Sequence, residues 1–247
     1  MKKIASVNNS FIKELRKLQL KKYRDQAEKF LIEGYHLVSE AASSGLLETV
    51  LICDEKDEIR GIENVLVTEE IIGKLAQSQA PQKIIGVCRF LPRGPLAGKR
   101  FLLLDGISDP GNMGTLIRSA LGFGVDCVIA SPDSVDIYND KVLRATQGAI
   151  FKIKILKEEL TGVIARLKAD GVIVYGALPK GGVPLRDLSR AEKHALVLGN
   201  ESRGIRDDIA ILCDENITIE TQTRLESLNV SVAGSVIMYF LSQKKNH

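Results

Sequence analysis

Three short segments hold most of the residues in this chain that could do chemistry. They are DPGNMGTLIRSA at 109–120, GNESRGI at 199–205 and SLNVSVAGS at 227–235. Each joins an apolar run typical of a strand to a Gly- or Ser-bearing turn and then to a helix-like segment. Open α/β sheets present backbone N–H groups and polar side chains at one edge in this way. We therefore expect a ligand site where the three segments meet.

The first segment combines a turn with a basic residue near the start of a helix. Asn112 is expected to cap that helix, which by itself would be a purely structural role. Arg118 is expected near the second turn, on the same face as Thr115. A cation near a helix N-terminus opposes the macrodipole, so we expect Arg118 to have an anionic or polar partner.

The second segment lets the backbone turn sharply, because it is bounded by Gly199 and Gly204. It lacks both the GK[ST] ending of a Walker loop and the GxGxxG spacing, which disfavours an NTPase or an NAD enzyme. Glu201 would repel phosphate, but it suits a cationic ligand or a hydroxyl group. An ordinary turn explains the segment equally well.

The third segment opens the last helix of the chain. Ser227 is a plausible N-cap, and Asn229 and Ser231 are expected inside the helix, where such residues need hydrogen-bond partners. The 3.6-residue spacing predicts a buried stripe of Leu228, Val232, Val236 and Phe240.

Strand-like and helix-like segments alternate from residue 100 onward, which predicts a doubly wound, mainly parallel sheet. The expected strands are FLLLD, DCVIA, IKIL, VIVYGAL, HALVLG and ENITI; the expected helices are 112–122, 139–147, 158–168 and 227–242, with a short one after Gly204. Residues 1–91 predict a smaller α/β domain, and the Pro- and Gly-rich run at 92–99 predicts a linker. The larger domain is expected at 100–247.

Positive charge gathers near the N-terminus, although the whole chain has a net charge of only +3. Residues 2–29 combine this charge with apolar residues at helical spacing, which predicts a basic amphipathic helix. A solvated helix face is the simpler interpretation, and an RNA-binding surface is favoured only if another site calls for nucleic acid. The candidates for RNA contact are Lys13, Lys17, Lys21, Lys22 and Arg24.

Composition excludes several classes of protein. With 247 residues and 45% hydrophobic content, the chain can form a full core. No apolar run approaches the roughly 20 residues of a membrane span, and no signal peptide is apparent, so we expect a cytoplasmic protein. No metal-binding motif appears, and we expect no metal. Reduced thiols are expected at the four separated cysteines, Cys53, Cys88, Cys127 and Cys213.

Taken together, NMGTLIRSA, LVLGNESRGI and SLNVSVA resemble the three motifs of the SpoU, or TrmH-like, RNA ribose 2′-O-methyltransferases of the SPOUT class. The run LRKLQLKKYR followed by FLIEG resembles the L30e-like substrate-binding domain of many rRNA-modifying members. The resemblance implies a trefoil knot in the C-terminal α/β domain, S-adenosylmethionine as cofactor and a homodimer. It also implies an RNA substrate, with rRNA favoured over tRNA.

Carried over to this sequence, the resemblance implies two sets of site residues. The catalytic set is Asn112, Arg118, Glu201, Ser227 and Asn229. The cofactor set is Leu198, Gly199, Asn200, Gly204, Ile219 and Leu228. The family's proposed role for Arg118 is a base acting across a dimer interface; a guanidinium that grips the target's phosphate and polarises the 2′ oxygen fits the same position.

One stretch departs from the family pattern. The third motif usually begins Ile-Pro-Met with a glycine two residues later, whereas this chain has Ile219-Glu220-Thr221-Gln222-Thr223. The missing proline and glycine predict a looser cofactor loop and weaker cofactor binding. A non-catalytic RNA-binding protein of the same fold is the alternative. A small-molecule methyltransferase is disfavoured by the basic N-terminal region.

Overall fold

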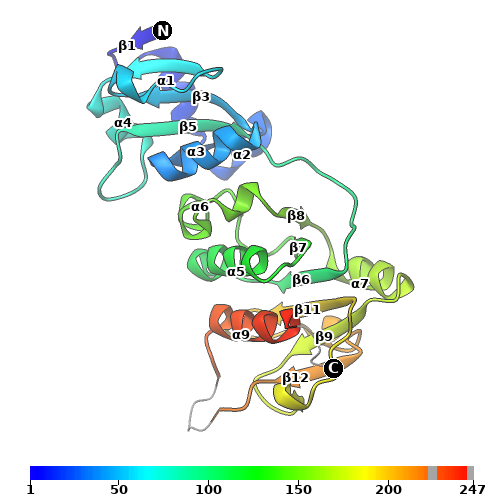
Figure 1. Ribbon diagram of the computed structural model, residues 1–247. Helices are drawn as coiled ribbons and strands as arrows, with labels where there is room; N and C mark the ends of the chain where they lie inside the picture. Colours follow the sequence, from blue (N-terminus) through cyan, green and yellow to red (C-terminus); the bar gives the residue numbers. More distant parts are fainter. Residues whose placement is uncertain (222–226, 244–247) are drawn as a thin grey trace. The chain divides into compact units, whose positions relative to one another are not determined.

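The computed structural model describes residues 1–221 and 227–243 and divides them between two compact units (Figure 1). The first unit contains 1–92 together with 138–152, and the second contains 93–137 and the rest of the chain from 153.

The first unit is a mixed five-stranded sheet with helices packed against it. Its strand order is β1 (Lys2–Ile4), β4 (Glu63–Val67), β3 (Leu47–Ile52), β5 (Ile84–Arg89) and β2 (Lys29–Glu33). Strand β4 is parallel to its two neighbours, and β5 is antiparallel to β3 and β2. The helices are α1 (Ser10–Lys17), α2 (Lys21–Ala27), α3 (Tyr35–Ser44) and α4 (Glu69–Leu75).

The N-terminal region is not the single amphipathic helix that its pattern predicts. Residues 2–4 form a strand, and two short helices follow, separated by a turn at 18–20. The predicted apolar face is present in part, because Leu15 and Leu18 are buried in the core. Arg24 is also buried, and its guanidinium donates to the carbonyl oxygens of Leu18 and Gln19 at 2.9 Å each. The buried guanidinium therefore stabilises the turn instead of presenting its charge to RNA.

Residues 138–152 pack with the first unit, although the sequence predicts them within the larger domain. They contain α6 (Asp140–Thr146) and a 3-10 helix, Ala149–Phe151. The ring of Tyr138 stacks on Phe90 at a centroid distance of 4.0 Å, and its hydroxyl accepts a hydrogen bond from Leu91 N at 2.9 Å. The Phe151 ring stacks on Phe30 at 6.4 Å. Aromatic packing thus joins this segment to the N-terminal sheet.

The second unit is an entirely parallel seven-stranded sheet, as the alternation of elements predicts. The order is β10 (Val183–Pro184), β12 (Glu215–Thr218), β9 (Ile173–Ala177), β11 (His194–Gly199), β6 (Arg100–Asp105), β7 (Cys127–Ala130) and β8 (Lys154–Lys157). Strands β6 and β11 are almost completely buried, which explains their continuous apolar runs. Strand β10 was not predicted from the sequence; it is only two residues long.

Helices cover both faces of this sheet. Helices α7 (Leu160–Ala169) and α8 (Asp207–Ala210) pack on the face that carries Phe101 and Leu103. Helices α5 (Pro110–Gly122) and α9 (Val230–Ser242) lie against each other, and α9 packs on β11 (Figure 1). The helix pair α5 and α9 holds two of the three motif segments.

Three further features are distributed along the chain. Within the described ranges 1–221 and 227–243, no helix is long and apolar enough to cross a membrane. The same residues contain no group of three or more His, Cys, Asp or Glu side chains arranged to hold a metal ion. The four cysteines are free thiols, as expected, and burial raises the pKa of Cys127 to about 12 and that of Cys213 to about 11.

Candidate active site

Strands β6 and β11 place the first two motif segments side by side. They are parallel neighbours, and Asp105 at the end of β6 pairs with Gly199 at the end of β11. The chain after Gly199 closes into a tight loop, in which Asn200 and Gly204 exchange backbone hydrogen bonds of 3.0 and 2.9 Å. A Cβ atom at Gly199 would lie 2.1 Å from the backbone of Gly204 and Ile205, so only glycine fits there.

Glu201, at the tip of this loop, binds the N-terminus of α5. One carboxylate oxygen accepts from Ser108 N at 3.1 Å and Ser108 Oγ at 2.8 Å; the other accepts from Asp109 N at 3.1 Å and Asn112 Nδ2 at 3.0 Å. Partial burial opposes ionisation, but the hydrogen bonds outweigh it and lower the pKa of Glu201 to about 2. Glu201 is therefore an anion at any physiological pH, with its lone pairs committed to the chain.

Two asparagines extend this contact to α9. The Asn112 Oδ1 accepts from Asn229 Nδ2 at 3.0 Å, and Asn229 Oδ1 accepts from Ser231 N at 2.9 Å and Ser231 Oγ at 2.6 Å. An ionised carboxylate can only accept, so Asn112 must turn its NH₂ toward Glu201 and its oxygen toward Asn229. The orientation of both amides is thus set by Glu201.

The structure corrects two predicted helix caps. Helix α5 begins at Pro110, and its cap is Asp109, which accepts from Asn112 N at 2.8 Å; Asn112 lies inside the helix. Helix α9 begins at Val230, and its cap is Asn229 instead of Ser227. In each case the helix begins at another residue than predicted, so a different polar side chain lies at the N-cap position, and the side chain of Asn112 is left to link the two helices.

The predicted buried stripe of α9 is also wrong. Val232 is 50% exposed and Val236 is 41% exposed, whereas the buried residues are Ser231, Gly234, Ile237, Met238 and Leu241. The small residues face α5 because the two helices approach closely. A Cβ at Gly234 would lie 2.6 Å from a Leu116 methyl group, and Ser235 Oγ lies 2.8 Å from Ser119 Oγ.

Arg118 and Ser227 differ from the other predicted catalytic residues. Both side chains are exposed. Neither forms a hydrogen bond or an ion pair with any residue in the described part of the chain, so the partner expected for Arg118 is not found there. The structure brings Glu201, Asn112 and Asn229 together, and Arg118 and Ser227 have no partner within 1–221 and 227–243.

Comparisons with known proteins decide which family this geometry belongs to. Residues 99–239 match the model of the SpoU rRNA Methylase family, and residues 9–86 match the MRM3-like substrate binding domain. The chain belongs to the SpoU rRNA methylase family. The predicted S-adenosylmethionine-dependent RNA ribose methyltransferase is confirmed at the level of the family.

Individual relatives of this SpoU protein match nearly its whole length. The 23S rRNA (guanosine(2553)-2′-O)-methyltransferase RlmP of Bacillus subtilis is 37% identical, and the alignment covers 98% of this chain and 99% of RlmP. An AdoMet-bound rRNA methyltransferase from Sinorhizobium meliloti has a similar structure, with a TM-score of 0.88, 28% identity and 97% of each chain covered. A TrmH-family structure from Porphyromonas gingivalis has a TM-score of 0.86 and 28% identity, covering 96% of this chain and 98% of that one.

The residues predicted to bind the cofactor of this SpoU protein fall into two groups. Leu198, Gly199, Asn200 and Gly204 belong to β11 and its loop, where Asn200 Nδ2 donates to Gly106 O at 2.7 Å. Ile219 and Leu228 are half-buried and precede and follow the stretch 222–226. Glycine backbone and apolar side chains are groups that line cofactor pockets, so the chemistry of these residues is compatible with S-adenosylmethionine.

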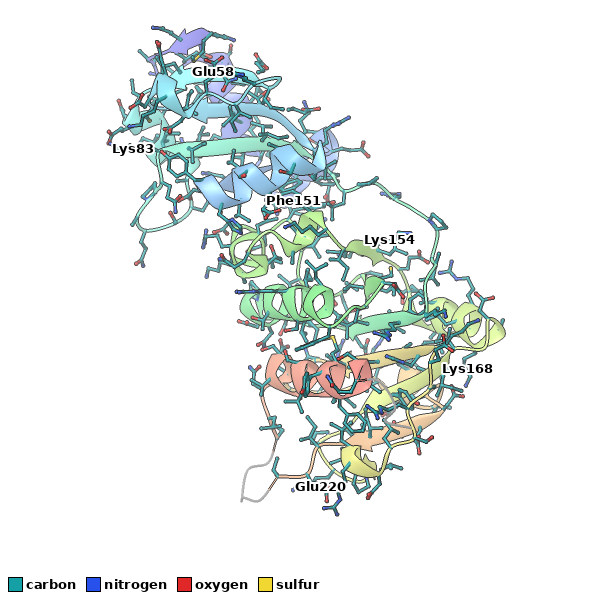
Figure 2. All side chains as sticks on the ribbon, in the orientation of Figure 1. Glu58, Lys83, Phe151, Lys154, Lys168 and Glu220 are labelled. Atoms are coloured by element: carbon teal, nitrogen blue, oxygen red, sulfur yellow. The ribbon has the colours of Figure 1, made fainter. Side chains whose placement is uncertain are left out.

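One residue of the departure in the third motif has a charged partner. Glu220, labelled in Figure 2, forms an ion pair with Arg186 at 2.9 Å, so its added charge has a cationic partner in the preceding segment. Gln222 and Thr223 lie outside the described residues.

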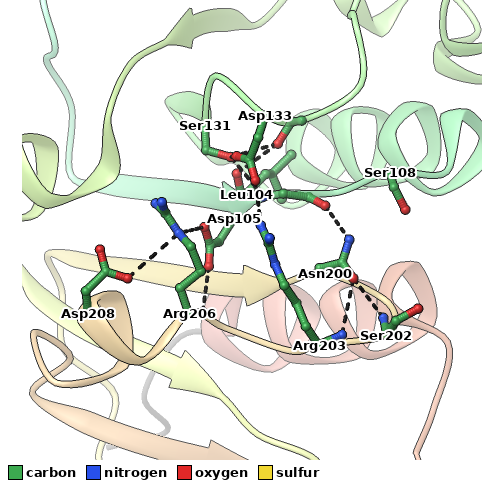
Figure 3. A network of polar contacts seen from close by, with 12 residues as sticks. Leu104, Asp105, Ser108, Ser131, Asp133, Asn200, Ser202, Arg203, Arg206 and Asp208 are labelled. Atoms are coloured by element: carbon green, nitrogen blue, oxygen red, sulfur yellow. Dashed lines mark hydrogen bonds and ion pairs between the residues drawn. The ribbon is translucent and has the colours of Figure 1, made fainter.

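Sequence reasoning missed several polar residues that hold the loop after β11. Asp105 is completely buried and accepts from Arg206 N and Arg206 Nε at 2.8 Å each (Figure 3). Arg203 forms an ion pair with Asp133. The charged residue at the end of the apolar run FLLLD was the available signal, because a buried carboxylate requires a partner.

Four of the five predicted RNA-contacting residues are exposed on α1 and α2. Lys17 pairs with Glu14 at 2.6 Å and Lys21 pairs with Asp25, whereas Lys13 has no ion pair among residues 1–221 and 227–243. Lys22 Nζ lies 5.9 Å from the centre of the Tyr23 ring. The fifth, Arg24, is the buried turn residue described above.

Proposed function

We propose that this protein methylates a ribose 2′-hydroxyl of 23S rRNA, at the guanosine that corresponds to the one named for RlmP. The end-to-end alignment with that enzyme supports this substrate, because it includes the N-terminal unit as well as the methyltransferase unit. Cytoplasmic location follows from the same proposal.

The residues of the site suggest a division of roles in methyl transfer. S-adenosylmethionine supplies a methyl group on a sulfonium, and the reaction needs the 2′ oxygen held in line with it. Arg118 has no partner in the described chain, and its guanidinium has the planar donor geometry that binds an RNA phosphate and can polarise the 2′ oxygen. Ser227 adds an exposed hydroxyl that can orient the ribose.

Glu201 is a positioning residue in this proposal. Its low pKa and its four hydrogen bonds make it a poor proton acceptor. Together with Asn112 and Asn229 it fixes α5, and so it fixes the helix that carries Arg118.

We also propose the homodimer and the trefoil knot of the family for this chain. Val232, Val236 and Tyr239, which is 55% exposed, form an apolar stripe on α9 that the described chain does not cover. Burying such a stripe against a second copy would be favourable, and Tyr239 lies beside Phe123 at the end of α5.

Lys13, Lys17, Lys21 and Lys22 are proposed to contact RNA phosphates. They lie on α1 and α2, in the part of the chain that matches a substrate-binding domain. Exposed lysines bind phosphate by releasing counterions, which makes the binding sensitive to salt.

Mapping of ribose methylation tests the substrate. RNA from cells with and without the gene should differ at one nucleotide of 23S rRNA, and the purified protein should restore that methyl group to RNA from the deletion strain. A loss confined to tRNA would overturn the proposed substrate. Absence of S-adenosylmethionine binding in calorimetry would instead favour a non-catalytic RNA-binding protein.

A further inference from the structure

The loop after β11 is held at two points. Glu201 binds the N-terminus of α5, as described above, whereas Arg203 binds Asp133 in the loop that follows β7 (Figure 3). Asp133 is itself held, because its other carboxylate oxygen accepts from Ser131 Oγ at 2.6 Å. The loop tip thus has two anchors, the anionic side chain of Glu201 and the cationic side chain of Arg203.

Gly106 lies at the centre of the second anchor. Its N–H donates to Ser131 Oγ at 2.8 Å, and its carbonyl accepts from Asn200 Nδ2 at 2.7 Å. A Cβ at Gly106 would lie 2.4 Å from Arg203 Nη2, and its φ of +71° also favours glycine. The guanidinium of Arg203 therefore occupies space that only a glycine at 106 leaves open.

We propose that Arg203, through Asp133 and Gly106, is a positioning residue that holds the 199–204 loop in the conformation that binds S-adenosylmethionine. The inference rests on the proposed role of this loop in cofactor binding. Without Arg203 the loop keeps its Asn200–Gly204 closure but loses its second anchor, so the loop tip is held by Glu201 alone and can pivot.

Arg203→Met tests this role because it removes the charge and keeps most of the apolar length. The variant should bind S-adenosylmethionine about three- to fivefold more weakly in calorimetry, as expected for losing one largely exposed ion pair. Without cofactor, amide exchange in 199–206 should accelerate by a similar factor. Arg203→Lys should restore part of the affinity.

Arg166→Met is a matched control. The Arg166–Glu158 pair is exposed to a similar degree, 52% and 38% against 49% and 46% for Arg203 and Asp133, and it lies on α7. This variant should leave cofactor affinity unchanged. Equal effects of the two arginine variants would overturn the inference.

Two further variants separate the anchor from direct RNA binding. Asp133→Asn should weaken cofactor binding as Arg203→Met does. If Arg203 bound RNA instead, loss of the Asp133 charge would free its guanidinium, and RNA affinity would rise. Gly106→Ala should also weaken cofactor binding, and combining it with Arg203→Met should add less than the sum of the two effects. Additive effects, or a change confined to RNA affinity, would contradict the proposal.

The outcome is distinguishable from failure of the proposed rRNA substrate. Calorimetry and amide exchange need no RNA, so the anchor can be established even if 23S rRNA is not methylated. A wild-type protein that does not bind S-adenosylmethionine would also contradict the proposed role of Arg203.

Discussion

The predicted catalytic residues form two groups that differ in their hydrogen bonding. Glu201, Asn112 and Asn229 form hydrogen bonds with one another and with backbone N–H groups. Arg118 and Ser227 are exposed and form no hydrogen bond with the described residues. We infer that residues of the first kind set the geometry of the site and that residues of the second kind are available to a substrate, so the motif residues would belong to two functional classes.

Replacing Arg118 should give the largest effect. Arg118→Ala is expected to reduce methyl transfer by about a hundredfold or more, as for loss of one charged group at a reacting oxygen. Cofactor affinity and the free energy of unfolding should not change, because Arg118 supports neither. Arg118→Lys should recover only part of the rate, because lysine lacks the planar fork. Loss of cofactor binding in Arg118→Ala would remove the distinction between the two classes.

Disrupting the stripe on α9 should have the next largest effect. Val236→Glu places a charge on the proposed dimer contact and should give a monomer in sedimentation at micromolar concentration, with a rate reduced roughly tenfold or more if Arg118 acts across the interface. The control is Ile211→Glu, because Ile211 is 81% exposed on another part of the unit. A monomeric wild type would contradict the homodimer.

Removing the charge of Glu201 should lower stability and rate together. Glu201→Gln loses the carboxylate and turns an NH₂ group toward donors, so the free energy of unfolding should fall by about 1 to 2 kcal/mol. The rate should fall several-fold, since α5 and Arg118 lose their support. Glu58→Gln, on an exposed carboxylate of the other unit, is the control in urea unfolding. An unchanged stability would show that Glu201 is not a positioning residue.

The pH dependence of unfolding also tests the role of Glu201. The pKa of Glu201 is lowered from 4.5 to about 2 in the folded protein, so its stabilising contribution is complete above about pH 4.5 and is lost as the pH falls toward 2. The stability difference between wild type and Glu201→Gln should be constant above pH 5 and should shrink below pH 4.5. A difference that varied between pH 6 and 8 would contradict the low pKa.

The smallest effects are expected on α1. Lys13→Gln should weaken RNA binding by a few-fold and reduce the slope of log K against log salt by about one. Lys180→Gln is the control, because Lys180 lies in the other unit. Equal slopes for the two variants would remove Lys13 from the RNA surface.

The order and type of the elements in the second unit could be read from the sequence, because buried parallel strands are continuous apolar runs between turn residues. The structural roles of Asn112, Ser227 and Val232 could not be predicted from the sequence. Asn112 is a residue type that can cap a helix, but Asp109 is also such a type and is the residue at the N-cap of α5. Helix α9 is apolar on more than one side, and spacing cannot show that Gly234 and Ser235, the small residues, face α5.

Longer-range contacts were the hardest to predict. No local pattern indicates that Arg24 is buried in the turn between two helices. Nor does any local pattern link Arg203 to Asp133, which is 70 residues away. Both depend on where the chain returns, which residue types alone do not determine.

The packing of residues 138–152 has a practical consequence for expressing parts of this protein. A methyltransferase fragment that starts at residue 93 would contain Tyr138 and Phe151 without Phe30 and Phe90, the rings on which they stack. It would expose two aromatic side chains to water and invite aggregation. The reciprocal fragment, ending at residue 92, would leave its own two phenylalanines uncovered. The border between the two units is therefore not a place where the gene can be cut to give two independently soluble proteins.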